Sequence, residues 1–116
     1  MGFDREARRL ALQGELEALL GDYVARMDDG SLAILFQPPE NVKLRYPCVI
    51  YEYDSDYFRH ADDRGYLSRQ RYDVLVIDRD PDTELPAMIV NHFAYCSHNS
   101  RYAADNLNHD SISLYY

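Results

Sequence analysis

Acidic side chains at alternate positions are the first candidates for chemistry in this sequence. Asp78, Asp80 and Asp82 occur in the segment DRDPD, as the first ligands of a calcium-binding EF-hand loop do. The rest of that loop pattern is missing, because Thr83 stands where glycine is needed and Ile89 where a bidentate glutamate is needed. We therefore interpret DRDPD as a solvated turn whose carboxylates cap the following helix.

Histidine and serine residues give no stronger signal. The four histidines have no metal-ligand spacing; they are His60, His92, His98 and His109. Ser97, His98 and Asp105 are the types of a hydrolase triad, but the sequence has no G-x-S-x-G nucleophile turn. We expect neither a metal site nor a serine hydrolase.

A second group of acidic residues lies between positions 54 and 63. Its members are Asp54, Asp56, Asp62 and Asp63, with Arg59 and Arg64 among them. Two carboxylates can serve a glycoside hydrolase, so an enzyme is one interpretation. The other is an exposed loop of mixed charge that docks a partner protein. We favour the loop, and we expect no enzymatic activity and no cofactor.

Length and charge limit the class of protein. The 116 residues predict one domain, 1–116, and the formal net charge is −8. Such a surface repels a phosphate backbone, so binding to DNA regardless of its sequence is not expected. No apolar run approaches the roughly 18 residues that span a membrane, and positions 1–12 lack a signal-peptide pattern. We expect no membrane partner.

The apolar spacing at the start predicts a long amphipathic helix within the helix region 1–30. One stripe contains Leu12, Leu16, Leu19, Leu20, Tyr23 and Met27. We expect one helix, capped by Asp4 and ending at Gly30. In the rival interpretation, Asp29 and Gly30 form the turn of a hairpin between 22–27 and 31–36.

Alternating apolar residues predict the strands of the remaining core, 31–116. The strand-like segments are 31–37, 46–53, 70–78, 94–102 and 108–116, and a short helix is expected near 85–93. The segment ADNLNH before the last strand has the side chains of a turn. We expect an α+β fold in which the two helices pack on a mainly antiparallel four-stranded sheet.

Tyrosine is unusually common, with 11 Tyr, 4 Phe and no Trp. Tyrosine suits protein interfaces, although its preference for strands explains the count equally well. Tyr51 and Tyr53 alternate with Cys48 and Ile50 on a strand that is apolar on both faces. Because one helix cannot easily cover both faces of the sheet, we expect part of it to be available to another subunit. The two cysteines, Cys48 and Cys96, are expected to be reduced.

Three segments resemble small proteins of long-tailed bacteriophages. They are FQPPENVKLRYPCVIYEYD, HADDRGYLSRQRYDVLVIDRDPDTELP and YCSHNSRYAADNLNHDSISLYY, and together they cover roughly residues 35 to 116. The resemblance is to the tail completion, tail terminator or minor capsid proteins of head–tail joining in siphophages. The most specific pieces are FQPP, YPC, IDRDPD and ADNLNH…LYY, none of which is catalytic. Two departures are a long segment 22–34 and an acidic residue, Asp110, where an aromatic one is more usual.

This resemblance implies a structural protein of the virion with a small tail-terminator-like fold. Six copies would form a ring that caps the tail tube, ends its growth and joins the tail to the head connector. The implied partners are other copies of the chain, the major tail tube protein and the connector or stopper protein. DNA would pass through the ring without specific binding. Assembly would occur in the host cytoplasm, and the place in the virion would be the neck. The alternative is a head-closure (stopper) protein or another head–tail joining protein.

We expect two regions to contact partners. The loop 54–67 would face a partner ring, and the DRDPD turn would lie near a subunit boundary, where arginines meet the many carboxylates. The expected contact residues are Tyr51, Tyr53, Tyr57, Phe58, Arg59, Arg64, Arg69, Arg71 and Arg79.

Overall fold

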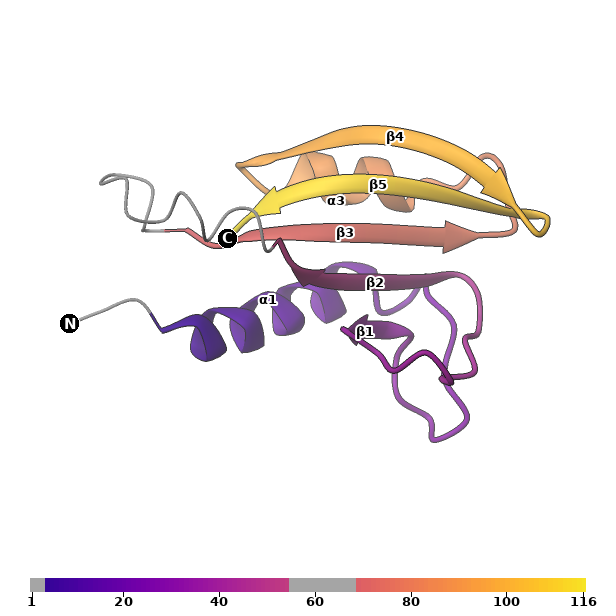
Figure 1. Ribbon diagram of the computed structural model, residues 1–116, viewed down its shortest axis with the longest axis horizontal. Helices are drawn as coiled ribbons and strands as arrows, with labels where there is room; N and C mark the ends of the chain where they lie inside the picture. The colour runs from indigo at the N-terminus through magenta and orange to yellow at the C-terminus, as the bar shows by residue number, and fades with distance from the viewer. Residues whose placement is uncertain (1–3, 55–68) are drawn as a thin grey trace.

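The computed structural model describes residues 4–54 and 69–116 (Figure 1). Along the chain, the elements are α1 (Arg5–Leu20), β1 (Ile34–Phe36), β2 (Cys48–Tyr53), β3 (Arg71–Asp78), α3 (Leu85–His92), β4 (Cys96–Ala104) and β5 (Leu107–Tyr115). The strands form one sheet in the order β1-β2-β3-β5-β4. Neither described helix is long and apolar enough to cross a membrane.

The expected α+β class is confirmed, and the sheet is mainly antiparallel as expected, but the expected number of four strands is wrong. The sheet has five strands and is mixed, because β1 pairs in parallel with β2 while the other neighbours are antiparallel. A parallel pair needs a connection long enough to return the chain to the starting end of the first strand. Segment 37–47, with Pro38 and Pro39 near its start, provides that connection.

The first helix is shorter than expected. It begins after Asp4, whose carboxylate accepts a hydrogen bond from the Ala7 N–H at 3.1 Å, as predicted. It ends at Leu20, with Gly21 as its C-cap, and not at Gly30. Glycine is among the weakest helix formers, which explains why the helix ends next to Gly21 although the apolar stripe continues.

Residues after Gly21 are closer to the rival hairpin interpretation. An isolated antiparallel bridge joins Arg26 to Leu32, and Gly30 has φ +88°, a conformation that favours glycine. Apolar residues of the stripe that follow the helix are still buried, but they are held by non-helical backbone. Val24 packs with the main core and Met27 with a smaller cluster on the opposite face of the sheet.

The main core lies between the two helices and one face of the sheet. Leu12, Leu16 and Leu20 of α1 are fully buried, and Leu85 and Ile89 of α3 join them. The strands contribute Val49, Tyr51, Tyr72, Val74, Val76, Ile112 and Leu114. In Figure 1, α3 lies behind β4 and β5. Its bounds agree with the helix expected near 85–93, with Pro86 in the first turn.

Neither of the described helices lies over the opposite face of the sheet. A small cluster of Ala33, Cys48 and Ile77 is covered at one end by loop residues, among them Met27, Leu44 and Tyr46. Cys48 and Cys96 are free thiols. Burial, with the nearby Asp78 carboxylate adding to it, raises the pKa of the Cys48 thiol to about 12.

A long hairpin connects β4 to β5. Asp105 and Asn106 both have positive φ, 56° and 63°, as the two central residues of a type I′ turn require. The predicted turn in ADNLNH is therefore confirmed. The hairpin extends to the right in Figure 1, and β4 forms the outer edge of the sheet.

Candidate assembly surface

The side chains that first suggested chemistry do not converge on a catalytic or metal site in residues 4–54 and 69–116. No group of three or more His, Cys, Asp or Glu residues in these ranges could hold a metal ion. His98 pairs with Asp110, with Nε2 at 2.8 Å from Oδ1, rather than with Asp105. His109 stacks on the ring of Tyr102, with the centroids 4.6 Å apart.

The DRDPD segment is a turn, but its carboxylates bond within the turn instead of capping α3. Asp78 Oδ1 accepts from the Asp80 N–H at 3.0 Å, and Asp80 Oδ1 accepts from the Asp82 N–H at 2.9 Å. The N-cap residue of α3 is Glu84, which makes no side-chain capping bond. The expected helix cap is therefore wrong, and the carboxylates of Asp80, Asp82 and Glu84 remain exposed.

Of the tyrosines expected at an interface, Tyr51 lies in the interior. Its side chain is fully buried, its hydroxyl donates to Gln13 Oε1 of α1, and burial raises its pKa to about 12. Such a residue supports the fold of one chain and cannot contact a partner in this conformation. Tyr53 is half-buried, with its ring 5.0 Å from that of Phe36 in an edge-on contact.

The three described arginines of the expected interface do not lie together. Arg71 forms an ion pair within its own chain, with Nε at 2.8 Å from Asp54 Oδ2. Arg79 follows the other end of β3 and lies over the ring of Tyr46, 5.3 Å from its centroid. Arg69 is exposed and lies 4.0 Å from the ring centroid of Tyr95. Tyr57, Phe58, Arg59 and Arg64 lie outside the described residues.

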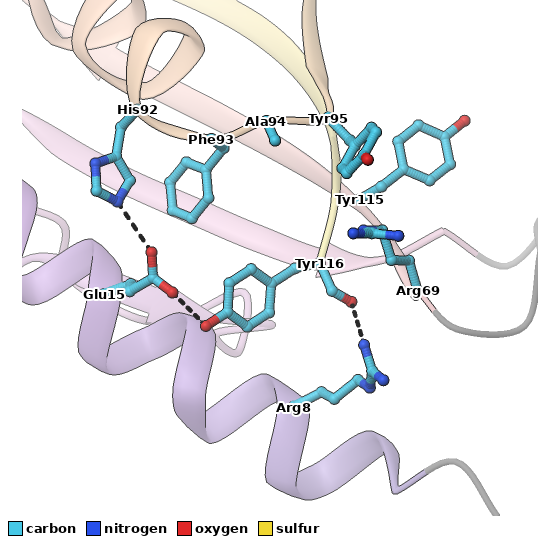
Figure 2. Close-up of a pocket in the computed structure, with 9 residues that line it drawn as sticks. All are labelled: Arg8, Glu15, Arg69, His92, Phe93, Ala94, Tyr95, Tyr115 and Tyr116. Atoms are coloured by element: carbon cyan, nitrogen blue, oxygen red, sulfur yellow. Dashed lines mark hydrogen bonds and ion pairs between the residues drawn. The ribbon is translucent and has the colours of Figure 1, made fainter.

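Arg69 belongs to an open groove of about 570 Å³ (Figure 2). We call it the basic groove. Its lining comes from α1, from the start of β3, from the end of α3 and the residues after it, and from the end of β5. The lining residues are Arg8, Glu15, Arg69, His92, Phe93, Ala94, Tyr95, Tyr115 and Tyr116.

The carboxylate of Glu15, in the lining of the groove, is bonded within the chain. Figure 2 shows Glu15 between Tyr116, whose hydroxyl donates to Oε2, and His92, whose Nε2 lies 2.9 Å from Oε1. These two partners, Tyr116 first, hold the pKa of Glu15 below its usual value. The same bond raises the pKa of Tyr116 to about 12. The Arg8 guanidinium donates to the carbonyl oxygen of Tyr116 at 3.4 Å, and the Arg69 guanidinium lies against the ring of Tyr95.

The outer edge of the sheet is a second candidate contact surface. Every residue from Ser97 to Ala104 of β4 is exposed, and the only Lys or Arg in the strand is Arg101. Natural edge strands are usually short, charged or covered, because an open edge invites pairing with another strand. A nine-residue edge with a single irregularity, between His98 and Ser100, has little of this protection.

Sequence reasoning did not find the basic groove, because its walls come from four segments that are distant in the chain. Arg69 was expected at a contact, but Arg8, Glu15, His92 and Tyr95 carried no motif. The adjacent pair Tyr115–Tyr116 in a strand with one polar face was the only local hint.

The chain matches no protein-family model, and comparison with curated proteins and with solved structures finds no significant match.

Proposed function

We propose that this chain is a structural protein that assembles with copies of itself into a ring at the neck of a phage tail. There the ring would cap the tail tube, end its growth and join the tail to the head connector. The observation that carries the proposal is the one-sided construction of the sheet. Within residues 4–54 and 69–116, both helices cover one face, whereas loops cover the other face at one end and β4 leaves an exposed edge.

The exposed side chains support an assembly protein. Among the described residues, the large hydrophobic side chains with the highest exposure are Leu10, Tyr23, Tyr95 and Tyr102. Tyrosine is enriched in the buried centres of protein interfaces, because its ring covers apolar area while its hydroxyl keeps a polar partner. Tyr95 precedes β4, Tyr102 lies in the second half of that strand, and Tyr23 lies beside the turn after β3, so these tyrosines could contact more than one neighbour.

The resemblance of the quoted segments supports the particular place in the virion. FQPP lies at the start of the connection between β1 and β2, YPC at the start of β2, and IDRDPD at the end of β3 and in the following turn. These are structural positions, in keeping with a protein that does no chemistry. The net charge of −8 also favours a wall along which DNA slides, because an acidic surface repels phosphate.

Tube growth in vitro tests the proposal. Tail tube protein from the same phage would be polymerised with and without the purified chain, and tube lengths would be measured by negative-stain electron microscopy. We expect shorter tubes that carry extra density at one end. Tubes of unchanged length without terminal density would contradict the proposal, and binding to the connector with no effect on tubes would favour the head-closure alternative. An unrelated acidic protein of similar size is the control.

A further inference from the structure

Three arginines from three separate connections line one hollow beside the small cluster of Ala33, Cys48 and Ile77. The hollow has a volume of about 530 Å³, and we call it the arginine hollow. Its apolar lining residues pack on the small cluster, so the connections that carry the arginines are held against the sheet. In Figure 1, two of these connections, 21–33 and 37–47, lie to the right of and below β2. The described residues that line the hollow are Ala25, Arg26, Leu44, Arg45, Tyr46 and Arg79, none of which is acidic.

Two of the guanidinium groups are oriented by contacts that are not ion pairs. Arg26 Nη1 donates to the carbonyl oxygen of Gly30 at 2.8 Å, and the Arg79 guanidinium lies 5.3 Å from the ring centroid of Tyr46. Neither arginine forms an ion pair within residues 4–54 and 69–116. Because an arginine has five N–H donors, these contacts fix the direction of each group and leave donors for a ligand.

The third arginine shows how one such group binds a single carboxylate. Arg45 forms an ion pair with Asp28, which is exposed and lies two residues after Arg26 in the chain. A carboxylate has two oxygens, and one guanidinium fork is sufficient for it. Three guanidinium groups around one hollow match an anion with more oxygens and more charge. A terminal phosphate group has both properties.

The acidic character of the chain favours a small ligand over a long polyanion. The formal net charge is −8, so a nucleic acid that extends over the surface meets repulsion beyond the hollow. A single phosphate group avoids that repulsion, because charges further than a Debye length of about 8–10 Å are screened. Asp78, which precedes Arg79, is buried and accepts a hydrogen bond from the Asp80 N–H.

From this arrangement we propose that the arginine hollow binds the phosphate group of a small phosphate monoester. Arg26, Arg45 and Arg79 donate to the three terminal oxygens of the phosphate. Leu44 and Tyr46 provide apolar contacts for the rest of the ligand. The site is complete in one chain, so it does not depend on the ring proposed above.

Titration with inorganic phosphate tests the site in its simplest form. Nuclear magnetic resonance of the ¹⁵N-labelled full chain follows the backbone and arginine signals, with sodium chloride at equal ionic strength as the reference. We expect saturable shifts at the three arginines that chloride does not produce. Arg26→Gln and Arg79→Gln should each raise the dissociation constant about tenfold, because each removes hydrogen bonds to a charged group. Lys43→Gln is the matched control, since it removes one positive charge from an exposed position of the connection that carries Arg45 but does not line the hollow.

Three further probes identify the kind of anion. Phenyl phosphate should bind more tightly than inorganic phosphate, whereas a short DNA duplex and a hexaglutamate peptide should not bind. Absence of saturable shifts at the arginines, or equal weakening by Lys43→Gln and Arg79→Gln, would show that the hollow is not a phosphate site. Tighter binding of the duplex would assign the arginines to DNA, and tighter binding of the peptide would assign them to an acidic protein; either result overturns the proposal. None of these results bears on the ring, which is tested separately by tube growth.

Discussion

Nε2 of His98 on β4 lies 2.8 Å from Oδ1 of Asp110 on the neighbouring strand β5, and Asp110 is almost completely buried. A buried carboxylate without a partner is costly, so the histidine explains how an acidic residue is accommodated on the helix-covered side of the sheet. Arg101 stands opposite Asp110 in the strand register, and both residues line a hollow of about 410 Å³ beside α3. The unusual residue of the last strand thus has a structural role.

Loss of this histidine should destabilise the fold. We expect His98→Ala to lower the free energy of unfolding by about 1–3 kcal/mol, because it removes the partner of a buried group. In an Asp110→Asn background the same substitution should cost less. Urea unfolding of the four proteins of this double-mutant cycle measures the coupling. Equal costs in both backgrounds would show that the two side chains do not interact.

The buried hydroxyl of Tyr51 should matter for stability and not for assembly. We expect Tyr51→Phe to cost about 1 kcal/mol, because Gln13 loses a hydrogen-bond donor in the interior. The mass of the assembled particle should not change. Tyr23→Phe, at a side chain that is 59% exposed, is the control and should leave stability unchanged. A Tyr51→Phe protein that is fully stable but fails to assemble would place this tyrosine at an interface after all.

Two glycines should respond in opposite directions to alanine. Gly14 lies within α1, and a Cβ there would meet no atom within 4 Å. Gly14→Ala should therefore stabilise the protein by up to about 1 kcal/mol. Gly30 has φ +88°, so Gly30→Ala should destabilise it by about 1–2 kcal/mol. Thermal unfolding of both variants is the measurement, and a stabilising Gly30→Ala would contradict the turn that replaces the end of the expected helix.

The contribution of Glu15 should depend on pH. Its pKa is lowered in the folded chain, first by Tyr116 and then by His92, so its stabilising effect is present above the ordinary carboxyl pKa. That effect is lost as the pH falls through the lowered value. The wild type should exceed Glu15→Gln in stability near pH 7 by less than about 1 kcal/mol, because the Glu15 side chain is 42% exposed. The difference should shrink below about pH 4.5, and a difference that grows on acidification would refute the assignment.

Local patterns were sufficient to predict much of the fold. Asp4 as a cap, the strands around Val49, Val74 and Ile112, and the short helix at Pro86 follow from side-chain chemistry and spacing that act over a few residues. The end of α1 did not follow, because Val24 and Met27 continue an apolar stripe from extended backbone. Periodicity alone does not distinguish the two conformations over so short a segment.

The contacts between distant segments could not be predicted. Nothing near Tyr51 in the sequence indicates that Gln13 of α1 covers it, so the burial of this tyrosine within one chain could not be foreseen. The same limit hid the pair of His98 and Asp110, which the register of β4 on β5 creates. The basic groove could not be predicted for the same reason, because its lining residues Arg8 and Tyr95 are far apart in the sequence.

The mass of the purified chain in solution is the most direct test of the central claim that this sheet is completed by other copies of the chain. Light scattering coupled to size exclusion, over a wide range of concentrations at low salt, gives that mass without a label. The account predicts a closed particle of six times the chain mass of 13.6 kDa. A monomer at every concentration, at low salt as well as at high salt, would contradict it.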